Sequence, residues 1–313
     1  MMRQQLAAVI NTTIEKYGFQ DSIAVVPEDL EIVEEEELVF WSTSAKPHPA
    51  KEQQLIVNDR LSALFDRSFT DRKSEETVFY HHLKLDQAVQ VLKDREIAFE
   101  SLEASKDKKE YLELYEQFHL FLPLGYSDGI LLDRRKQVYR LPLRDNQGLK
   151  PLFNTADQQS DLRVALGFKI RNKQEKYAGI WDFRAVLYGE VKAFEMAREI
   201  QQHILEQFGK KFIVLGFDKY SRFYKNAAYS EEQEQRLCLD LTLFSNSFVE
   251  LMGRKWEGCT SDVDKRELET VFIPFDNELF ELELCELAFA PEVSPSQVAE
   301  VKKWIAKGIP VVA

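Results

Sequence analysis

Apolar positions recur along the chain with two periods, and each period predicts one kind of element. A period of three to four residues predicts amphipathic helices over 3–17, 110–118 and 190–208. The apolar face of the first helix carries Leu6, Val9, Ile10, Thr13 and Tyr17. Each of these helices has one face to bury, so each needs a core to pack against.

Short runs of β-branched and aromatic residues predict strands over 164–170, 183–189 and 212–217. The stretch 77–103 changes period twice along its length. Its two ends are β-like, and the helical face between them consists of Leu85, Ala88, Val89 and Leu92. This stretch therefore predicts a strand, a helix and a second strand.

A further helix is predicted where Ser294 precedes Pro295. Serine caps exposed N–H groups at a helix start, and proline fits the first helical position. The pattern after this start turns three apolar side chains inward, namely Val298, Val301 and Ile305.

Strands and helices are mixed without regular βαβ alternation, so we predict an α+β fold with mixed, largely antiparallel sheets and flanking helices. The stretch "STSAKPHPAKEQQ" (42–54) has the composition of a loop or linker. We place the softest boundary between it and Thr77. The expected division is an N-terminal helix and strand extension at 1–76, packed on the core, and a main domain at 77–313.

The net charge of −12 over 313 residues argues against general binding to nucleic acid, because phosphate binding rests on Lys and Arg. Three cysteines without a CxxC spacing predict reduced thiols rather than a disulfide framework or zinc site; they are Cys238, Cys259 and Cys285. We find no secretory h-region and no apolar run near the ~20 residues of a membrane span. These observations predict a cytoplasmic protein without membrane contact or a bound metal.

The stretch "GYSDG" (125–129) formally matches the nucleophile elbow of serine hydrolases around Ser127. That chemistry needs a histidine later in the chain. The only later one is His203, which falls inside a predicted amphipathic helix. Because Tyr-Ser-Asp-Gly is also an ordinary β-turn sequence, we favour the turn.

The stretch "KNAAYSEEQEQRLCLDLTLF" (225–244) changes from charged to alternating residues. Its leucines are Leu237, Leu239, Leu241 and Leu243, and they alternate with Cys238, Asp240 and Thr242. Such a period of two favours a strand with one buried face. Extending the alternation backwards places Glu232, Glu234 and Arg236 together on the opposite, polar face.

Three interpretations of this polar face remain open. It can be a solvated charge ladder. It can hold a polar ligand, with Arg236 neutralising one carboxylate while the other accepts hydrogen bonds from hydroxyls. It can also begin as a helix, because Ser230 and Gln233 have the spacing of a capping box.

His81 and His82 follow the strand-like residues 78–80 directly. Neighbouring side chains of a strand point to opposite faces, so at most one of the two enters a given cleft. Taken alone, the pair favours one packed and one solvated histidine.

A resemblance to a known family joins these features. Lys225, Tyr229, Glu232, Glu234 and Arg236 match the C-terminal signature of the bacterial family known as domain of unknown function 2971. That signature is Lys, then Trp, then Glu-x-Glu-x-Arg, so Tyr replaces Trp here. "FYHHLKLDQAVQVLKDREIAF" resembles the opening strand, helix and strand of the family, and "LGFKI" and "AVLYGE" follow in matching order. The resemblance covers about residues 78–307 and includes the family's last strand and helix.

The family in turn resembles the ADP-ribosyltransferase fold, in which a first-strand His and a late-strand Glu frame NAD. The resemblance implies that His81 or His82 contacts the adenosine ribose, and that Glu234 or Glu232 contacts the nicotinamide ribose 2′-hydroxyl. It implies catalytic roles for these glutamates and places Lys225, Tyr229 and Arg236 with the histidines in the cofactor-binding set. NAD would be the substrate, and the activity would be ADP-ribosyl transfer in a toxin, stress or phage-defence role.

This chain also departs from the family pattern. Only Asp107 and Glu110 remain of an Asn-Asp-Pro-x-Glu element, and a Ser-Phe-Ser stretch has no clear counterpart near 119–135. These departures favour an alternative, a non-catalytic binding or regulatory protein that keeps the fold without the chemistry. In either case, the implied partner is a small-molecule nucleotide.

Overall fold

The structure is a computed structural model, and it describes twelve parts of the chain. These are residues 1–34, 54–58, 61, 64–65, 76–104, 111–120, 135–145, 163–173, 181–214, 218–240, 270–306 and 309–312. The chain forms two compact units. Unit 1 comprises residues 1–70, 107–133 and 187–230, and unit 2 comprises residues 71–106, 134–186 and 231–313.

Unit 1 combines helices with two small sheets. Its elements are α1 (Met2–Lys16), η1 (Pro27–Asp29), β1 (Glu31–Glu34), β2 (Gln54–Asn58), α5 (Glu113–Phe118), β8 (Leu187–Tyr188), α8 (Lys192–Phe208), β9 (Lys211–Val214), α9 (Asp218–Ser221) and β10 (Tyr224–Lys225). Strands β1, β2 and β9 form one sheet, and β8 pairs with β10 in another. The short helix η6 (Ala227–Glu232) follows and ends just beyond the unit boundary.

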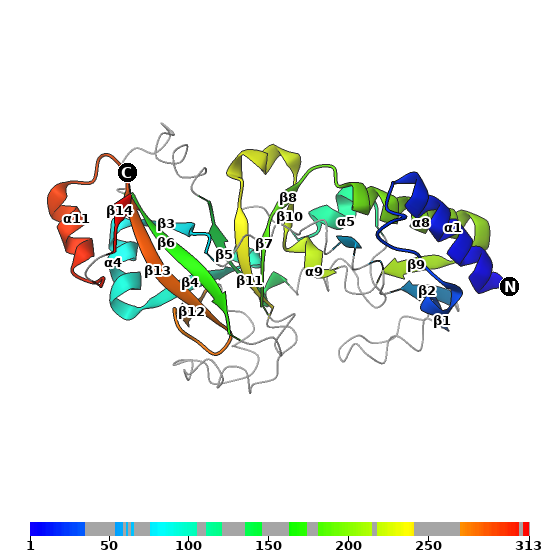
Figure 1. The fold of residues 1–313 in the computed structure, drawn as a ribbon, viewed down its shortest axis with the longest axis horizontal. Helices are drawn as coiled ribbons and strands as arrows, with labels where there is room; N and C mark the ends of the chain where they lie inside the picture. Colours follow the sequence, from blue (N-terminus) through cyan, green and yellow to red (C-terminus); the bar gives the residue numbers. More distant parts are fainter. Residues whose placement is uncertain are drawn as a thin grey trace. The chain divides into compact units, whose positions relative to one another are not determined.

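Helices α1 and α8 lie against each other through their apolar faces (Figure 1). Leu6, Ile10 and Ile14 of α1 are buried, as are Ile200 and Ile204 of α8. This packing confirms the helices predicted over 3–17 and 190–208.

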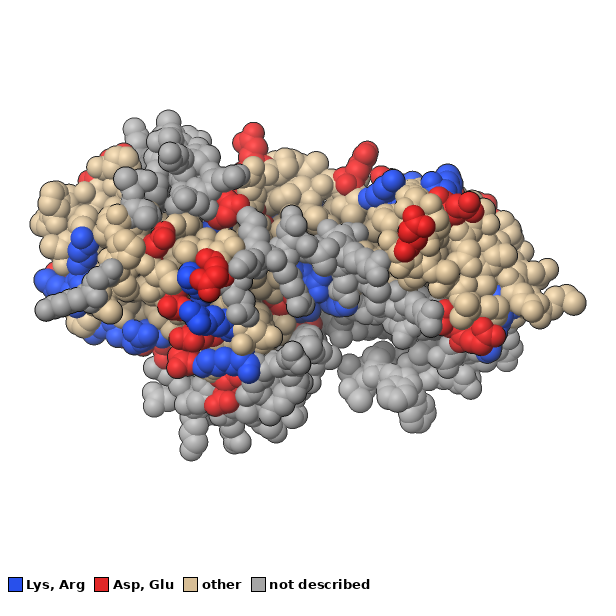
Figure 2. All heavy atoms as spheres, in the orientation of Figure 1, with Lys and Arg blue, Asp and Glu red and all other residues tan. Residues whose placement is uncertain are grey.

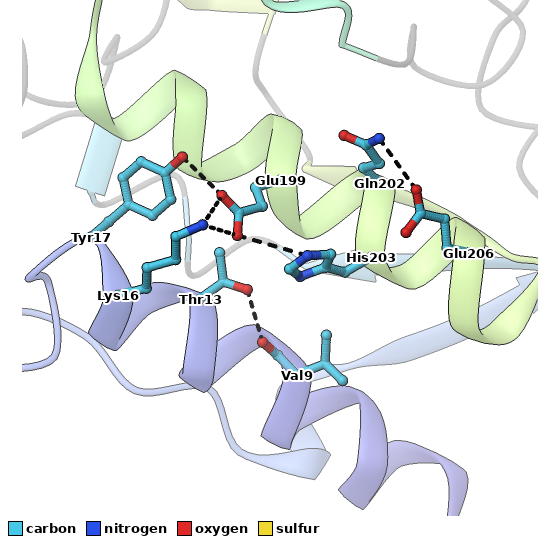
Figure 3. Close-up of polar contacts among 8 residues, drawn as sticks. All are labelled: Val9, Thr13, Lys16, Tyr17, Glu199, Gln202, His203 and Glu206. Carbon is cyan, nitrogen blue, oxygen red and sulfur yellow. Dashed lines mark hydrogen bonds and ion pairs between the residues drawn. The ribbon is translucent and has the colours of Figure 1, made fainter.

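A polar contact closes one end of the α1–α8 packing (Figure 3). The carboxylate of Glu199 accepts hydrogen bonds from the Lys16 ammonium at 2.6 and 2.7 Å and from the Tyr17 hydroxyl at 3.0 Å. His203 Nε2 lies 3.7 Å from the same carboxylate. Burial raises the pKa of Glu199, but the hydrogen bonds from Lys16 and Tyr17 and the nearby positive charge outweigh it, so the pKa is lowered.

Unit 2 contains two larger sheets. Its elements are β3 (Phe79–Lys84), α4 (Leu85–Asp94), β4 (Glu96–Ser101), η3 (Leu102–Ala104), β5 (Val138–Leu143), β6 (Arg163–Asn172), β7 (Trp181–Ala185), β11 (Gln235–Asp240), β12 (Thr270–Pro274), β13 (Phe280–Phe289), α11 (Pro295–Lys302) and β14 (Val311–Val312). The sheet orders are β12-β4-β5-β11-β7 and β14-β13-β6-β3. All neighbouring strands are antiparallel except β13 and β14.

The core of unit 2 takes residues from both sheets. Phe79 and Phe168 come from the four-stranded sheet, and Phe99, Leu141 and Leu237 come from the five-stranded sheet. Helices α4 and α11 pack against each other beside this core (Figure 1). Alternation along the strands places these apolar residues on the inner faces.

The two sheets of unit 2 join at an isolated bridge between Tyr80 of β3 and Arg144, the residue after β5. The Tyr80 N–H donates to the Arg144 carbonyl at 2.7 Å, and the Arg144 N–H donates back at 2.9 Å. This bridge brings β3 beside β5.

The predicted α+β class with largely antiparallel sheets is confirmed by these elements. The strand, helix and strand expected over 77–103 are β3, α4 and β4. The Ser294 hydroxyl accepts a hydrogen bond from Gln297 N at 3.4 Å, which confirms the predicted start of α11.

The compact units group the chain differently from the expected division at 76/77. Residues 187–230 join residues 1–70 because α8 packs on α1 and β9 pairs with β2. The sequence patterns predicted α1, α8 and a strand over 212–217 but not β2, and they carried no information on which distant segments would pair.

Candidate functional site

Strand β11 carries the centre of the predicted site. It runs between β5 and β7 and pairs with both in antiparallel register. Its six residues are buried on both faces, so the expectation of a single buried face is wrong. An internal strand can bury its polar face when the charges on that face are paired, and this is the case here.

The strand begins later than the simple alternation predicts. Glu232 is the last residue of η6, and Gln233 has a φ of +45°, so the extended backbone starts at Gln235. The predicted alignment on one polar face therefore holds for Glu234 and Arg236 but does not extend to Glu232. The open alternative of a helical start followed by a strand describes this segment better.

Glu234 and Arg236 form a bidentate ion pair. Arg236 Nε donates to Glu234 Oε1 at 2.7 Å, and Arg236 Nη2 donates to Oε2 at 3.2 Å. The exposed fractions of the two side chains are 5% and 0%. Two parallel charge-assisted hydrogen bonds fix the orientation of the carboxylate as well as its charge.

A second acid–arginine pair lies on the neighbouring strand. Arg184 of β7 is directly opposite Arg236, and its guanidinium donates to Asp182 two residues away. Like charges directly opposite each other in a sheet repel. Each arginine is compensated by an acid two residues earlier in its own chain, so this face tolerates the close approach.

The first predicted histidine belongs to the junction of the two sheets. His81 Nδ1 lies 2.9 Å from the Pro142 carbonyl oxygen. A carbonyl only accepts, so Nδ1 carries the hydrogen. Burial lowers the pKa of His81 to about 4. The ring is therefore neutral at pH 7, and Nε2 is an unprotonated acceptor.

Pro142 connects this histidine to the ion pair. It lies on β5 directly opposite Arg236 of β11. His81, Pro142 and Arg236 thus come from three elements that meet in unit 2, and Glu234 joins them through its pair with Arg236.

The remaining predicted residues lie elsewhere. His82 follows His81 on β3, and strand alternation turns it to the face that carries Tyr80. Lys225 and Tyr229 belong to unit 1, where the Lys225 ammonium lies 5.7 Å from the centre of the Tyr229 ring. Lys225 and Tyr229 are therefore close to each other. Both belong to unit 1, whereas Glu234 belongs to unit 2.

Three further positions were missed from the sequence, namely Pro142, Asp182 and Arg184. A signal for the last two exists, because Asp182-Phe183-Arg184 repeats the acid-x-Arg spacing of Glu234-Gln235-Arg236. Pro142 gave no such signal, since its role depends on the pairing of β5 with two other elements. Ser127, Asp107, Glu110 and Cys259 lie outside the described residues.

A cavity of about 160 Å³ in unit 2 is separate from these residues. Its walls include Leu92, Phe275 and Trp304, and none of the predicted site residues lines it. Figure 2 shows acidic and basic side chains interleaved over the part of unit 2 that carries β13. Ion pairs there include Arg171 with Glu283.

Comparisons with protein-family models, with curated proteins and with solved structures gave no match. Within the described part of the chain, no helix has the length and apolar character needed to cross a membrane.

Proposed function

We propose that unit 2 binds NAD and transfers its ADP-ribose group, with Glu234 as the catalytic carboxylate. The observation that supports this proposal is the fixed Glu234–Arg236 pair, which Pro142 links to His81. His81 lies on β3, the first strand that the structure describes in unit 2, and Glu234 directly precedes β11. The family resemblance implies that an ADP-ribosyltransferase-like core uses a histidine and a glutamate from such positions. The cysteine composition supports action in the cytoplasm.

In this reaction the main contribution of the protein is a negatively charged group held in position. The bond between ribose C1′ and the nicotinamide nitrogen breaks, and nicotinamide leaves with the electron pair. An acceptor atom then bonds to C1′ and releases its proton to solvent. Positive charge develops on the ribose in between, and a fixed carboxylate such as Glu234 stabilises it.

The pair with Arg236 is compatible with this role. The guanidinium donates to both carboxylate oxygens of Glu234, and this fixes the orientation of the carboxylate. Arg236 also places a positive charge directly beside the carboxylate. Glu232, half-buried at the end of η6, is the alternative that the family resemblance implies for the contact with the nicotinamide ribose 2′-hydroxyl.

A second candidate function is a non-catalytic nucleotide-binding or regulatory protein. The same ion pair favours it, because side chains only 5% and 0% exposed serve equally well to hold an internal strand together. In this case, NAD would bind without being consumed.

Turnover of labelled NAD separates the two candidates. The full chain should release nicotinamide or transfer label, and Glu234→Gln should lower that rate at least about a hundredfold if the carboxylate carries the charge stabilisation. Glu231→Gln is the matched control, because Glu231 is an exposed neighbouring acid. A thermal melt of each variant separates lost chemistry from lost fold. Equal rates for Glu234→Gln and the wild type would contradict the catalytic assignment, whereas binding without turnover supports the second candidate.

A further inference from the structure

Along the strands that the structure describes, the backbone of β5 is only partly paired on the side away from β11. Among the described residues, β4 pairs with β5 at Arg140 and Tyr139, which lie earlier in the strand. Arg144, two residues later, pairs with Tyr80 of β3. Pro142 therefore lies between the end of one strand pairing and the start of another.

The Pro142 carbonyl points away from β11, to the side of β5 where β4 and β3 pair. The backbone carbonyl of Glu234 accepts a hydrogen bond at 2.9 Å from the N–H of Val186, the residue after β7. Because backbone groups two residues apart in a strand point to the same side, the N–H and C=O of Arg236 also point to β7. Arg236 and Pro142 thus form a pair without mutual backbone hydrogen bonds. A proline fits such a position because it has no N–H to leave unsatisfied.

His81 supplies the missing partner with its side chain. Its Nδ1–H donates to the Pro142 carbonyl at 2.9 Å, at the position where a strand would otherwise have donated a backbone N–H. The bond ties β3 to β5 directly opposite Arg236. A buried carbonyl without a donor is costly, so this contact holds the strand in place.

We infer that His81 is a positioning residue, whose Nδ1–H fixes the part of β5 opposite Arg236 and so sets the Glu234 carboxylate. Its catalytic consequence rests on the proposed function, but the structural role does not. This role differs from the ligand contact that the family resemblance implies, because that contact would use the other ring nitrogen, Nε2.

Two substitutions of His81 distinguish the role of Nδ1 from that of Nε2. The side-chain N–H of asparagine falls near the position of Nδ1, whereas the longer glutamine places a polar atom near Nε2. With NAD as the probe, His81→Asn should keep kcat within about threefold, and His81→Gln should lower kcat about tenfold or more with little change in KM. The opposite order, with His81→Asn weakening NAD binding and His81→Gln retaining it, would overturn the inference.

A second experiment tests the positioning role of His81 without measuring enzymatic activity. Ring nitrogen NMR shifts of His81 should report the Nδ1–H tautomer in the wild type, and His81→Asn should melt above His81→Gln. The same two changes at His82, on the other face of β3, should not reproduce this order. If the wild type binds no NAD, the proposed function fails while this experiment still tests the positioning role. An Nε2–H tautomer, or equal melting of the two His81 variants, would contradict it.

Discussion

Arg236 holds the carboxylate of Glu234 through two hydrogen bonds of 2.7 and 3.2 Å, and both side chains are buried. The two residues are separated by Gln235 alone, and β11 lies between two other strands. This relationship links the fold to the proposed chemistry, because the same contact stabilises the strand and orients the carboxylate.

Removing one partner of the Glu234–Arg236 pair should strongly destabilise the fold. Arg236→Met leaves Glu234 buried without its cation, and we expect a loss of about 3–5 kcal/mol in the free energy of unfolding. Urea denaturation measures this loss. The double variant Glu234→Leu with Arg236→Met should recover most of it, since two apolar residues leave no unpaired charge. A double variant as unstable as the single one would show that the pair is not the source of the effect.

The stability of the chain should depend on pH through His81. Its pKa is about 4 in the folded state, against an ordinary value of 6.5. Between these values the unfolded state binds more protons, so stability falls as pH is lowered from 6.5 to 4, by up to about 3 kcal/mol. Urea denaturation of the wild type and His81→Asn across this range should show a smaller pH dependence in the variant. Parallel curves would contradict the assignment.

Gly167 should not tolerate a side chain. A Cβ at this position of β6 would lie 2.9 Å from Tyr80 Cε1 and 2.9 Å from Val78 Cγ1. We expect Gly167→Ala to cost about 1–3 kcal/mol in unfolding free energy, because overpacking forces the neighbours aside. The control is Gly209→Asn, since Gly209 has open space and a φ of +62° that asparagine adopts readily. A loss at Gly167 no greater than at Gly209 would contradict the packing argument.

The contact of Glu199 with Lys16 and Tyr17 should contribute only modestly to the free energy of unfolding (Figure 3). The Lys16 side chain is 62% exposed, so solvent screens its pair with Glu199. Glu199→Gln should lower the unfolding free energy by about 1 kcal/mol or less, and 1 M salt should reduce the difference. Glu206→Gln, on the same helix, is the control. A difference unchanged by salt would indicate that the Tyr17 hydrogen bond, rather than charge, dominates.

Local patterns predicted the elements well where one periodicity governed a segment. Alternating leucines identified β11, and Ser294 with Pro295 identified the start of α11. The same alternation failed at Glu232, because a positive φ at Gln233 breaks the strand parity. The alternation of residue types in the sequence does not show where the backbone leaves the extended conformation.

The site depended on information that no local pattern contains. The importance of Pro142 arises from its position opposite Arg236 and from its bond to His81, a residue 61 positions away in the chain. Likewise, Arg184 matters because antiparallel pairing places it beside Arg236. Such register relationships follow from tertiary packing, so sequence reasoning could name Glu234, Arg236 and His81 without seeing what joins them.

Titration calorimetry of NAD into the full chain is the decisive measurement for NAD binding by this protein. We predict saturable binding by the wild type and by Glu231→Gln. Nicotinamide should be released in the same wild-type samples, and Glu234→Gln should abolish this release. Absence of any binding heat and of any released nicotinamide from folded wild-type protein would contradict it.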